Sequence, residues 1–207
     1  MANSVRFWDR IAARYARRPV ADEAAYQEKL RITREYLSPD MTVLEFGCGT
    51  GSTAIAHAPH VKQVLASDVS PKMIEIAREK AAAAGVDNVS FEVAALDDLE
   101  AADGSIDAVL GLSILHLLSD RDAAIATVKR MLKPGGAFVS STACVGESMK
   151  FFKYVGPPLA RLGLIPMVRV FTVDQLVASV KAAGFEIEHQ WLPRKGAAVF
   201  IVARKPA

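Results

Sequence analysis

The residues that most clearly indicate chemistry lie in the stretch VLEFGCGTGS, residues 43–52. Gly47, Gly49 and Gly51 stand at alternate positions, directly after an apolar run that contains Glu45. Glycine permits positive φ angles, and because it lacks a Cβ atom it lets a ligand approach the backbone amides closely. The loop is therefore expected to bind a ligand that lies against the backbone.

The spacing of this loop differs from two common phosphate-binding loops. The dinucleotide fingerprint has glycine at the sixth position, where this chain has Ser52, and the P-loop has a Gly-Lys pair that is absent here. The carboxylate of Glu45 would repel a pyrophosphate but attract an ammonium group. A nucleoside that carries an amino acid fits these residues best, and the nicotinamide cofactor of an oxidoreductase is the alternative.

A second carboxylate supports the nucleoside interpretation. Asp68 ends the next apolar run, where a carboxylate accepts hydrogen bonds from both hydroxyls of a ribose. Met73 follows in the first turn of a predicted helix, either against an adenine ring or in the core. Ribose is common to nicotinamide and other nucleoside cofactors, so these two residues leave the base open.

These residues need a scaffold, and the chain alternates short apolar runs with helical patterns, as βαβ units do. Strands are predicted at residues 42–46, 62–68, 89–94, 106–112, 136–142, 185–191 and 197–203. In a parallel α/β sheet, the loop after the first strand lies at the carboxyl edge, where ligands bind. The last two strands, joined by a turn around Lys195 and Gly196, are expected to form an antiparallel hairpin at the end of the sheet.

Local signals mark the ends of the helices. Ser70 is a predicted N-cap, and Gly85 a predicted left-handed closing residue, of the helix after the second strand. The sequence TVDQ at 172–175 is a capping box for a helix that ends near Gly184. KPGG at 133–136 predicts a turn before the fifth strand.

The composition argues against several classes of protein. With 207 residues, of which 51% are hydrophobic and 23% charged, the chain suits a single globular domain. The net charge of +2 argues against an obligatory nucleic-acid partner. Two distant cysteines suggest neither a disulfide framework nor a metal site, and they favour a cytoplasmic location. No secretory signal is predicted, because the N-terminal residues contain arginines throughout and no continuous apolar run. No transmembrane segment is predicted, because the apolar stretch 151–171 contains prolines and basic residues.

Four motifs follow one another along the chain: VLEFGCGTG, VLASDVSPKMIEIAREKA, FEVAALDDLEAADGSIDAVLGLSILHLL and MLKPGGAFVSS. In order and spacing they resemble the class I S-adenosylmethionine-dependent methyltransferases, in the small-molecule branch with a type 11-like domain. The resemblance covers residues 40–142 closely and the flanking segments more loosely. It implies an α/β, Rossmann-like fold, with a seven-stranded, mostly parallel sheet, helices on both faces and a C-terminal antiparallel hairpin strand. It also implies S-adenosyl-L-methionine as the cofactor.

The resemblance implies roles for residues of a cofactor site. Glu45 and the glycine loop would hold the methionine portion, and Asp68 the ribose hydroxyls. Ser113, after the fourth strand, would lie near the sulfonium and the acceptor. Ala95 stands where many members carry a carboxylate for the adenine amino group, so Asp97 is the substitute. The expected cofactor-binding residues are Tyr15, Glu45, Gly47, Cys48, Gly49, Gly51, Asp68, Val69, Met73, Leu96, Asp97 and Ser113.

The implied reaction is in-line transfer of a methyl group from a sulfonium to a nucleophile, for which the protein mainly aligns donor and acceptor. If the acceptor is a hydroxyl or an enol, a base assists the reaction. His116 is the histidine predicted at the active end of the sheet, which makes it the candidate catalytic residue. The alternative is a structural histidine in an apolar run. No metal ligand is expected.

Residues 1–207 are expected to form one methyltransferase domain. Its regions are N-terminal helices at 4–17 and 21–37 within 1–38, a cofactor-binding core at 40–142, a variable acceptor-side segment at 144–171, and a final helix and hairpin at 172–207. The first helix carries Arg6, Arg10, Arg14 and Arg18 on one face and Phe7, Trp8, Ile11 and Tyr15 on another. This pattern suits a helix on an anionic membrane surface or a lid over the cofactor, and we favour the lid.

The variable segment is rich in apolar residues and contains Phe151, Phe152 and Tyr154, which favours a small, apolar or aromatic acceptor. The sequence SILH after the fourth strand differs from the Asn/Asp-Pro-Pro-aromatic tetrapeptide of enzymes that methylate amino groups of nucleic acids. O- or C-methylation of a small molecule is the leading hypothesis. A nicotinamide-dependent oxidoreductase and a non-catalytic cofactor-binding module are the alternatives, and the oligomeric state is left open.

Overall fold

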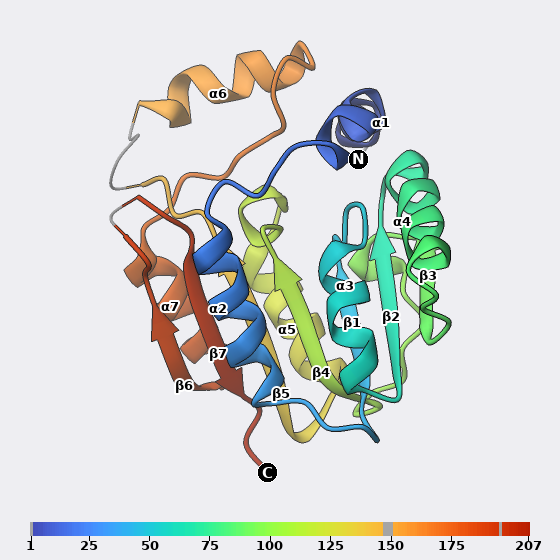
Figure 1. Ribbon diagram of the computed structural model, residues 1–207. Coiled ribbons are helices and arrows are strands. Elements are labelled where there is room, and N and C mark those ends of the chain that lie inside the picture. The colour runs from blue at the N-terminus through green and yellow to red at the C-terminus, as the bar shows by residue number, and fades with distance from the viewer. Residues whose placement is uncertain (1, 147–150, 195) are drawn as a thin grey trace.

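A seven-stranded sheet forms the centre of the computed structural model, which describes residues 2–146, 151–194 and 196–207 (Figure 1). The strand order is β3-β2-β1-β4-β5-β7-β6. The strands are β1 (Thr42–Phe46), β2 (Gln63–Asp68), β3 (Val89–Val93), β4 (Ile106–Leu112), β5 (Leu132–Thr142), β6 (Glu186–Trp191) and β7 (Val199–Arg204). The order reverses between β1 and β4, which places the loop after β1 at the switch point where α/β proteins bind ligands.

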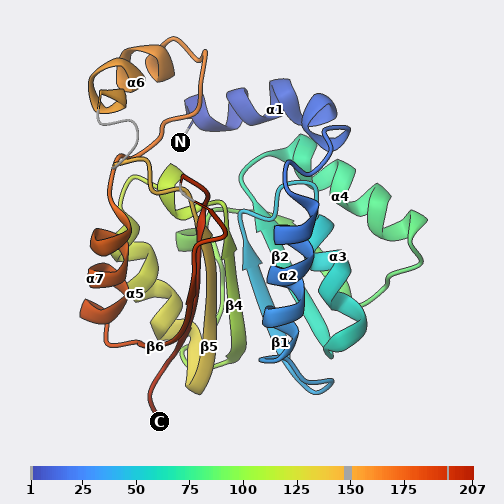
Figure 2. The same ribbon diagram turned by 60° about the vertical axis from the view of Figure 1, so that its left-hand side comes forward.

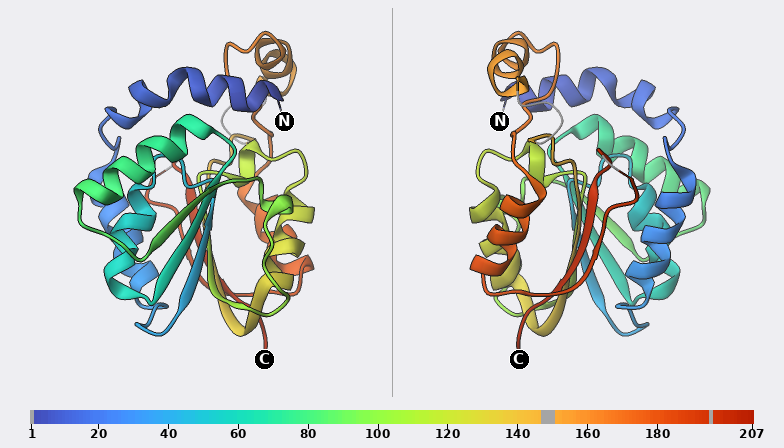
Figure 3. Two further views of the ribbon diagram at one scale, coloured as in Figure 1. Left: turned by 90° about the vertical axis from the view of Figure 1, so that its right-hand side faces the viewer. Right: turned by 90° about the vertical axis from the view of Figure 1, so that its left-hand side faces the viewer.

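Helices cover both faces of the sheet, which confirms the predicted fold class. In Figures 2 and 3, α2, α3 and α4 lie on one face and α5 and α7 on the other, while α1 and α6 lie across one end. The helices are α1 (Ala2–Ala16), α2 (Glu23–Arg34), α3 (Ser52–His57), α4 (Pro71–Ala83), α5 (Arg121–Met131), α6 (Phe152–Arg161) and α7 (Val173–Ala182). Single turns of 3-10 helix are η1 (Ala58–His60), η2 (Leu96–Asp98) and η3 (Leu115–Leu117).

Two hydrophobic cores follow from the alternation of side chains along the strands. Val43 packs into the core beneath α2, α3 and α4, whereas its neighbour Leu44 packs into the core beneath α5 and α7. In β7 the same alternation sends Phe200 to the first core and Ile201 to the second. Strands buried on both faces explain why these runs are continuously apolar in the sequence.

The last two strands pair as the sequence predicts, and β7 lies inside the sheet. It pairs antiparallel with β5 on one side and with β6 on the other, whereas β1 to β5 pair in parallel. Gly196 in the predicted turn has a φ of +80°. Lys195 of that turn lies outside the described residues.

The predicted ends of two helices are confirmed by their hydrogen bonds. The hydroxyl of Ser70 accepts a main-chain amide at 3.2 Å at the start of α4, and Gly85 after its end has a φ of +64°. The side chain of Thr172 accepts from the amide of Gln175 at 3.2 Å, and the side chain of Gln175 accepts in return at 3.0 Å. This is the capping box that TVDQ predicts.

The predicted turn at KPGG is wrong in one respect, because β5 begins before it. Ile106 of β4 pairs with Leu132, but Ala108 pairs with Ala137, so the register shifts between them. Gly135 has a φ of +75° inside this shift. Residues 133–136 therefore lie in an irregular part of β5, for which the glycines that favour turns are equally suited.

The segment that follows β5 adds a helix that the sequence analysis did not predict. This is α6, which includes Pro157 and Pro158. Six large apolar side chains between residues 151 and 164 are exposed, namely Phe151, Tyr154, Val155, Leu159, Leu162 and Leu164. Residues 147–150 of the predicted variable segment lie outside the described residues. Within the described part of the chain, no helix combines the length and the hydropathy that crossing a bilayer needs.

Candidate cofactor and acceptor site

A cavity of about 890 Å³ lies beyond the carboxyl ends of the central strands, beneath α1. Its wall brings together segments that are far apart in the sequence, because parallel strands present their carboxyl ends at one edge. Eleven of the twelve predicted cofactor-binding residues line it, namely Tyr15, Glu45, Gly47, Cys48, Gly49, Asp68, Val69, Met73, Leu96, Asp97 and Ser113. The exception is Gly51.

The three loop glycines differ in what surrounds them. A Cβ atom on Gly47 would lie 2.7 Å from the side chain of Ile114, and one on Gly51 would lie 2.9 Å from Ala77 and from Phe91. At Gly49 the nearest atom would be a ring carbon of Tyr15, 3.9 Å away. Gly47 and Gly51 therefore permit close packing, whereas Gly49 keeps the backbone open toward the cavity. Gly51 does not line the cavity, and its predicted part in cofactor binding stays a prediction.

Glu45 is a buried carboxylate in the cavity wall. It is only 3% exposed, and its Oε2 has no hydrogen-bond partner among the described residues. Burial and the nearby charge of Asp68 raise its pKa to about 8, while a hydrogen bond from the Ala54 amide opposes the rise. A carboxylate oxygen without a partner is costly unless a ligand provides one. An ammonium group in the cavity would do so, as the sequence predicts for the methionine end of the cofactor.

Asp68 connects the glycine loop to the next helix. Its Oδ2 accepts the Gly49 amide at 2.9 Å and its Oδ1 accepts the Ser70 amide at 2.9 Å. Burial raises the pKa of Asp68, and these amides work against the rise. Each carboxylate oxygen has a second lone pair. Those lone pairs fit the two hydroxyls of a ribose.

The expected adenine side of the cavity is less polar. Met73 and Leu96 line it and are 2% and 7% exposed. Asp97 lies exposed on η2 at the same wall, beside Ala95. Asp97 thus lines the cavity, and its role as an adenine ligand stays a prediction.

Ser113 lies at the tip of β4 in an uncommon backbone conformation. Its φ is +60°, the one positive φ of a residue other than glycine in the described ranges. Its amide donates to the Ser141 carbonyl at 2.7 Å. Strained residues of this kind persist where neighbours hold them, and they occur often at functional sites. The hydrogen bond to β5 fixes Ser113 at the cavity wall.

His116 does not line the cavity, although its neighbour Leu117 does. Burial lowers the pKa of His116 to about 4, and its Nδ1 has no partner among the described residues. Its carbonyl accepts the Arg169 amide at 2.8 Å. The turn of η3 determines where the side chains of its residues point. The sequence shows only that His116 follows the end of a strand, and this does not reveal the direction of its side chain. This placement argues against His116 as the catalytic base.

Helix α1 covers the cavity and is attached to α4. The carboxylate of Asp9 accepts the Ser70 hydroxyl at 2.6 Å. Phe7 is buried and forms a T-shaped pair with Trp8, with ring centroids 5.2 Å apart. Burial, followed by the charge of Asp68, raises the pKa of Tyr15. All three aromatic residues line the cavity, as a lid would require.

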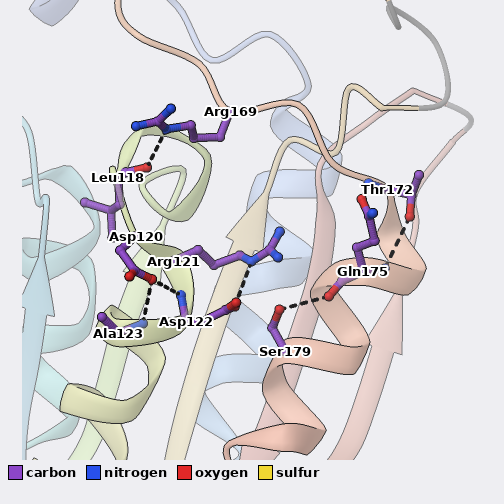
Figure 4. A network of polar contacts seen from close by, with 9 residues as sticks. All are labelled: Leu118, Asp120, Arg121, Asp122, Ala123, Arg169, Thr172, Gln175 and Ser179. Atoms are coloured by element: carbon purple, nitrogen blue, oxygen red, sulfur yellow. Dashed lines mark hydrogen bonds and ion pairs between the residues drawn. The ribbon is translucent and has the colours of Figure 1, made fainter. Parts of the chain in front are cut away.

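A polar network joins the segment before α7 to the start of α5 (Figure 4). Arg169 donates to the Leu118 carbonyl at 3.4 Å, and Asp120 caps α5 by accepting two main-chain amides at 3.0 and 2.9 Å. The guanidinium of Arg121 lies 4.3 Å from the ring centre of Phe171. These contacts hold the segment before α7 against the start of α5, where both border the cavity.

Sequence analysis missed one side of the cavity, which α2 supplies. Its residues Tyr26, Lys29, Leu30 and Thr33 line the wall. Lys29 Nζ donates to Ser141 Oγ at 2.9 Å, and burial lowers the pKa of Lys29. The sequence did contain a signal for this wall, because these four residues are spaced so that they lie on one face of a helix.

Known proteins match the core of the chain. Residues 43–136 match a family model described as a methyltransferase domain. The 27-O-demethylrifamycin SV methyltransferase of Amycolatopsis mediterranei is 32% identical over 148 residues, which are 70% of this chain and 54% of that protein. The ubiquinone biosynthesis O-methyltransferase of Xanthomonas axonopodis pv. citri is 37% identical over 101 residues, 48% of this chain and 42% of that protein. The chain thus spans about half the length of these curated relatives.

A solved structure shows the same fold. The crystal structure of the YcgJ protein from Bacillus subtilis matches with a TM-score of 0.71 at 21% identity, over 87% of this chain and 99% of that one. The sheet order, the glycine loop at the switch point and the family match agree with one another. Over residues 43–136 the chain is similar to the class I S-adenosylmethionine-dependent methyltransferases, and this similarity supports S-adenosylmethionine as the cofactor.

Proposed function

We propose that this protein transfers a methyl group from S-adenosylmethionine to oxygen or carbon of a small, largely apolar or aromatic acceptor. The division of the cavity wall carries this proposal. The end beside β1 and β2 is lined by carboxylates and glycine amides. The end beneath α1 and η3 is lined mainly by apolar side chains, among them Phe7, Trp8, Leu117, Leu118, Ile165 and Met167.

The residues of the chain have to bind and orient the methyl donor and the acceptor, and to exclude water from them. The cofactor supplies an electrophilic methyl group, so the protein needs no nucleophile of its own. Glu45 would pair with the ammonium group and Asp68 with the ribose, while the apolar wall keeps water from the acceptor. Alignment of donor and acceptor contributes on the order of 7–11 kcal/mol to lowering the barrier.

The names of two relatives support an acceptor of this kind. One acts on 27-O-demethylrifamycin SV and the other is an O-methyltransferase of ubiquinone biosynthesis. Cys48 and Cys144 are not joined in a disulfide bond, which suits a reducing compartment, and we place the protein in the cytoplasm on that basis.

Isothermal titration calorimetry tests the cofactor first, with S-adenosylmethionine, S-adenosylhomocysteine and NADH as a control. Binding of the first two without NADH, followed by methyl transfer to members of a panel of phenols, quinols and polyketides, is the expected result. Binding of NADH alone would favour the oxidoreductase. Cofactor binding without transfer to any member of the panel would favour a non-catalytic module.

A further inference from the structure

Lys29 lies in the cavity wall that α2 supplies, and its partner Ser141 pairs with Leu112 at the tip of β4. Its ammonium donates to the Ser141 side chain at 2.9 Å. The main-chain carbonyl of the same serine accepts the Ser113 amide at 2.7 Å. Lys29, Ser113 and Ser141 all line the cavity. One residue of β5 therefore connects the lysine to the strand end beside which the methyl donor is expected.

The charge of Lys29 is not balanced within the protein. No carboxylate of the described residues lies within 4.0 Å of its ammonium, and Asp22 acts on it only at longer range. Two of the carboxylates that line the cavity are committed elsewhere, because Asp68 accepts main-chain amides and Asp120 caps α5. The other two, Glu45 of β1 and Asp97 of η2, form no ion pair with Lys29. An ammonium group has three donors, and a partly buried one without a counter-ion is unfavourable. A ligand anion would compensate it.

We propose that Lys29 is the binding site for an ionised oxygen of the acceptor, so that the acceptors are phenols or enols. This rests on the proposed function. The acceptor binds as its oxyanion, after its proton has passed to water. The oxygen electron pair then forms the new bond to the methyl carbon, and the carbon–sulfur bond breaks with its electron pair moving to sulfur. The charges of the oxyanion and the sulfonium both disappear, Lys29 stays protonated, and the ether that forms no longer pairs with it.

4-Nitrophenol is a direct reporter, because its ionised form absorbs visible light and its neutral form does not. It is added, at a pH below its own pKa, to protein saturated with S-adenosylhomocysteine. The wild-type protein is expected to bind it as the phenolate. Lys29→Met is expected to weaken that binding by about tenfold or more, because it removes a hydrogen bond between charged groups. Lys29→Arg should restore a large part of it.

Controls separate this inference from the cofactor assignment. Affinity for S-adenosylhomocysteine should be the same in Lys29→Met as in wild type. Lys62→Met removes an exposed lysine before β2, and it should change neither the affinity for S-adenosylhomocysteine nor the affinity for the phenolate. Lys29→Gln replaces Lys29→Met if the latter does not fold. Any of three results would overturn the proposal. The variant without Lys29 could bind the phenolate as tightly as wild type does, wild type could bind the non-ionisable 4-nitroanisole as tightly as 4-nitrophenol, or 4-nitrophenol could stay neutral when wild type binds it. If the wild-type protein does not bind S-adenosylhomocysteine, the proposed function itself is overturned.

Discussion

At the scale of single residues, the carboxylate of Glu45 determines how the site responds to pH. Its pKa of about 8 means that much of it is protonated at neutral pH in the free protein. Pairing with an ammonium group requires the ionised form, so a proton must leave when the cofactor binds. The cost of that proton release grows as the pH falls below about 8, and cofactor affinity should fall with it.

Glu45→Gln tests this directly. The amide keeps the shape but cannot supply a negative charge, so cofactor affinity should fall by about tenfold to a hundredfold. Its dependence on pH near 8 should also disappear. Calorimetry in buffers with different ionisation enthalpies measures both the affinity and the protons released. An affinity of wild type that does not change between pH 6 and pH 9 would contradict the assignment.

The glycines of the loop after β1 allow a matched comparison. Gly49→Ala has space for its methyl group but keeps a φ of +54°, so it should destabilise the fold by about 1–2 kcal/mol and obstruct the cofactor. Gly51→Ala brings its methyl group to 2.9 Å from Ala77, so it should destabilise by about 2–5 kcal/mol. Urea unfolding and cofactor titration measure the two effects. Equal loss of stability in both variants would contradict the different roles given to these glycines.

At the scale of elements, α1 is held on α4 by few polar contacts. Asp9→Ala removes the acceptor for the Ser70 hydroxyl, so α1 should detach more often. We expect faster tryptic cleavage at the exposed arginines of α1 and weaker cofactor binding. Addition of S-adenosylhomocysteine should slow the cleavage in wild type more than in the variant. Asp98→Ala, on exposed η2, is the matched control. Unchanged cleavage in Asp9→Ala would argue against α1 as a lid.

Sequence predicted the elements better than it predicted the contacts between them. The strands, the caps of α4 and α7 and the glycine loop depend on residues close together in the chain, so their patterns are local. The hydrogen bond between Lys29 and Ser141 joins residues 112 positions apart, and nothing local to either residue indicates it. The direction of the His116 side chain likewise depends on the path of η3, and the apolar run around this residue does not reveal that path.

At the scale of the whole molecule, α1 and α6 lie together at the end that contains the cavity (Figure 1). Arg10 of α1 donates to the Gly163 carbonyl just after α6. The exposed apolar side chains of α6 and the exposed arginines of α1, including Arg6 and Arg14, would suit an anionic bilayer surface.

We therefore expect the protein to co-sediment with vesicles that contain phosphatidylglycerol, and less with vesicles of phosphatidylcholine alone. Leu162→Asp should reduce the bound fraction, because Leu162 is 72% exposed and would place a charge at the lipid surface. Leu192→Asp, an exposed leucine after β6, is the control. Absence of sedimentation with anionic vesicles would count against the membrane interpretation and leave the lid interpretation of α1 unaffected.

The position of β7 has a consequence for how the protein is made. The strand that comes last in the chain fills the place between β5 and β6, and Val199 to Ala203 are fully buried there. While the ribosome is still adding those residues, β6 has no neighbour to pair with and the far edge of β5 is open. The half of the sheet that contains β1, β2 and β4 can assemble on the nascent chain, whereas the other half must wait until β7 has left the ribosome.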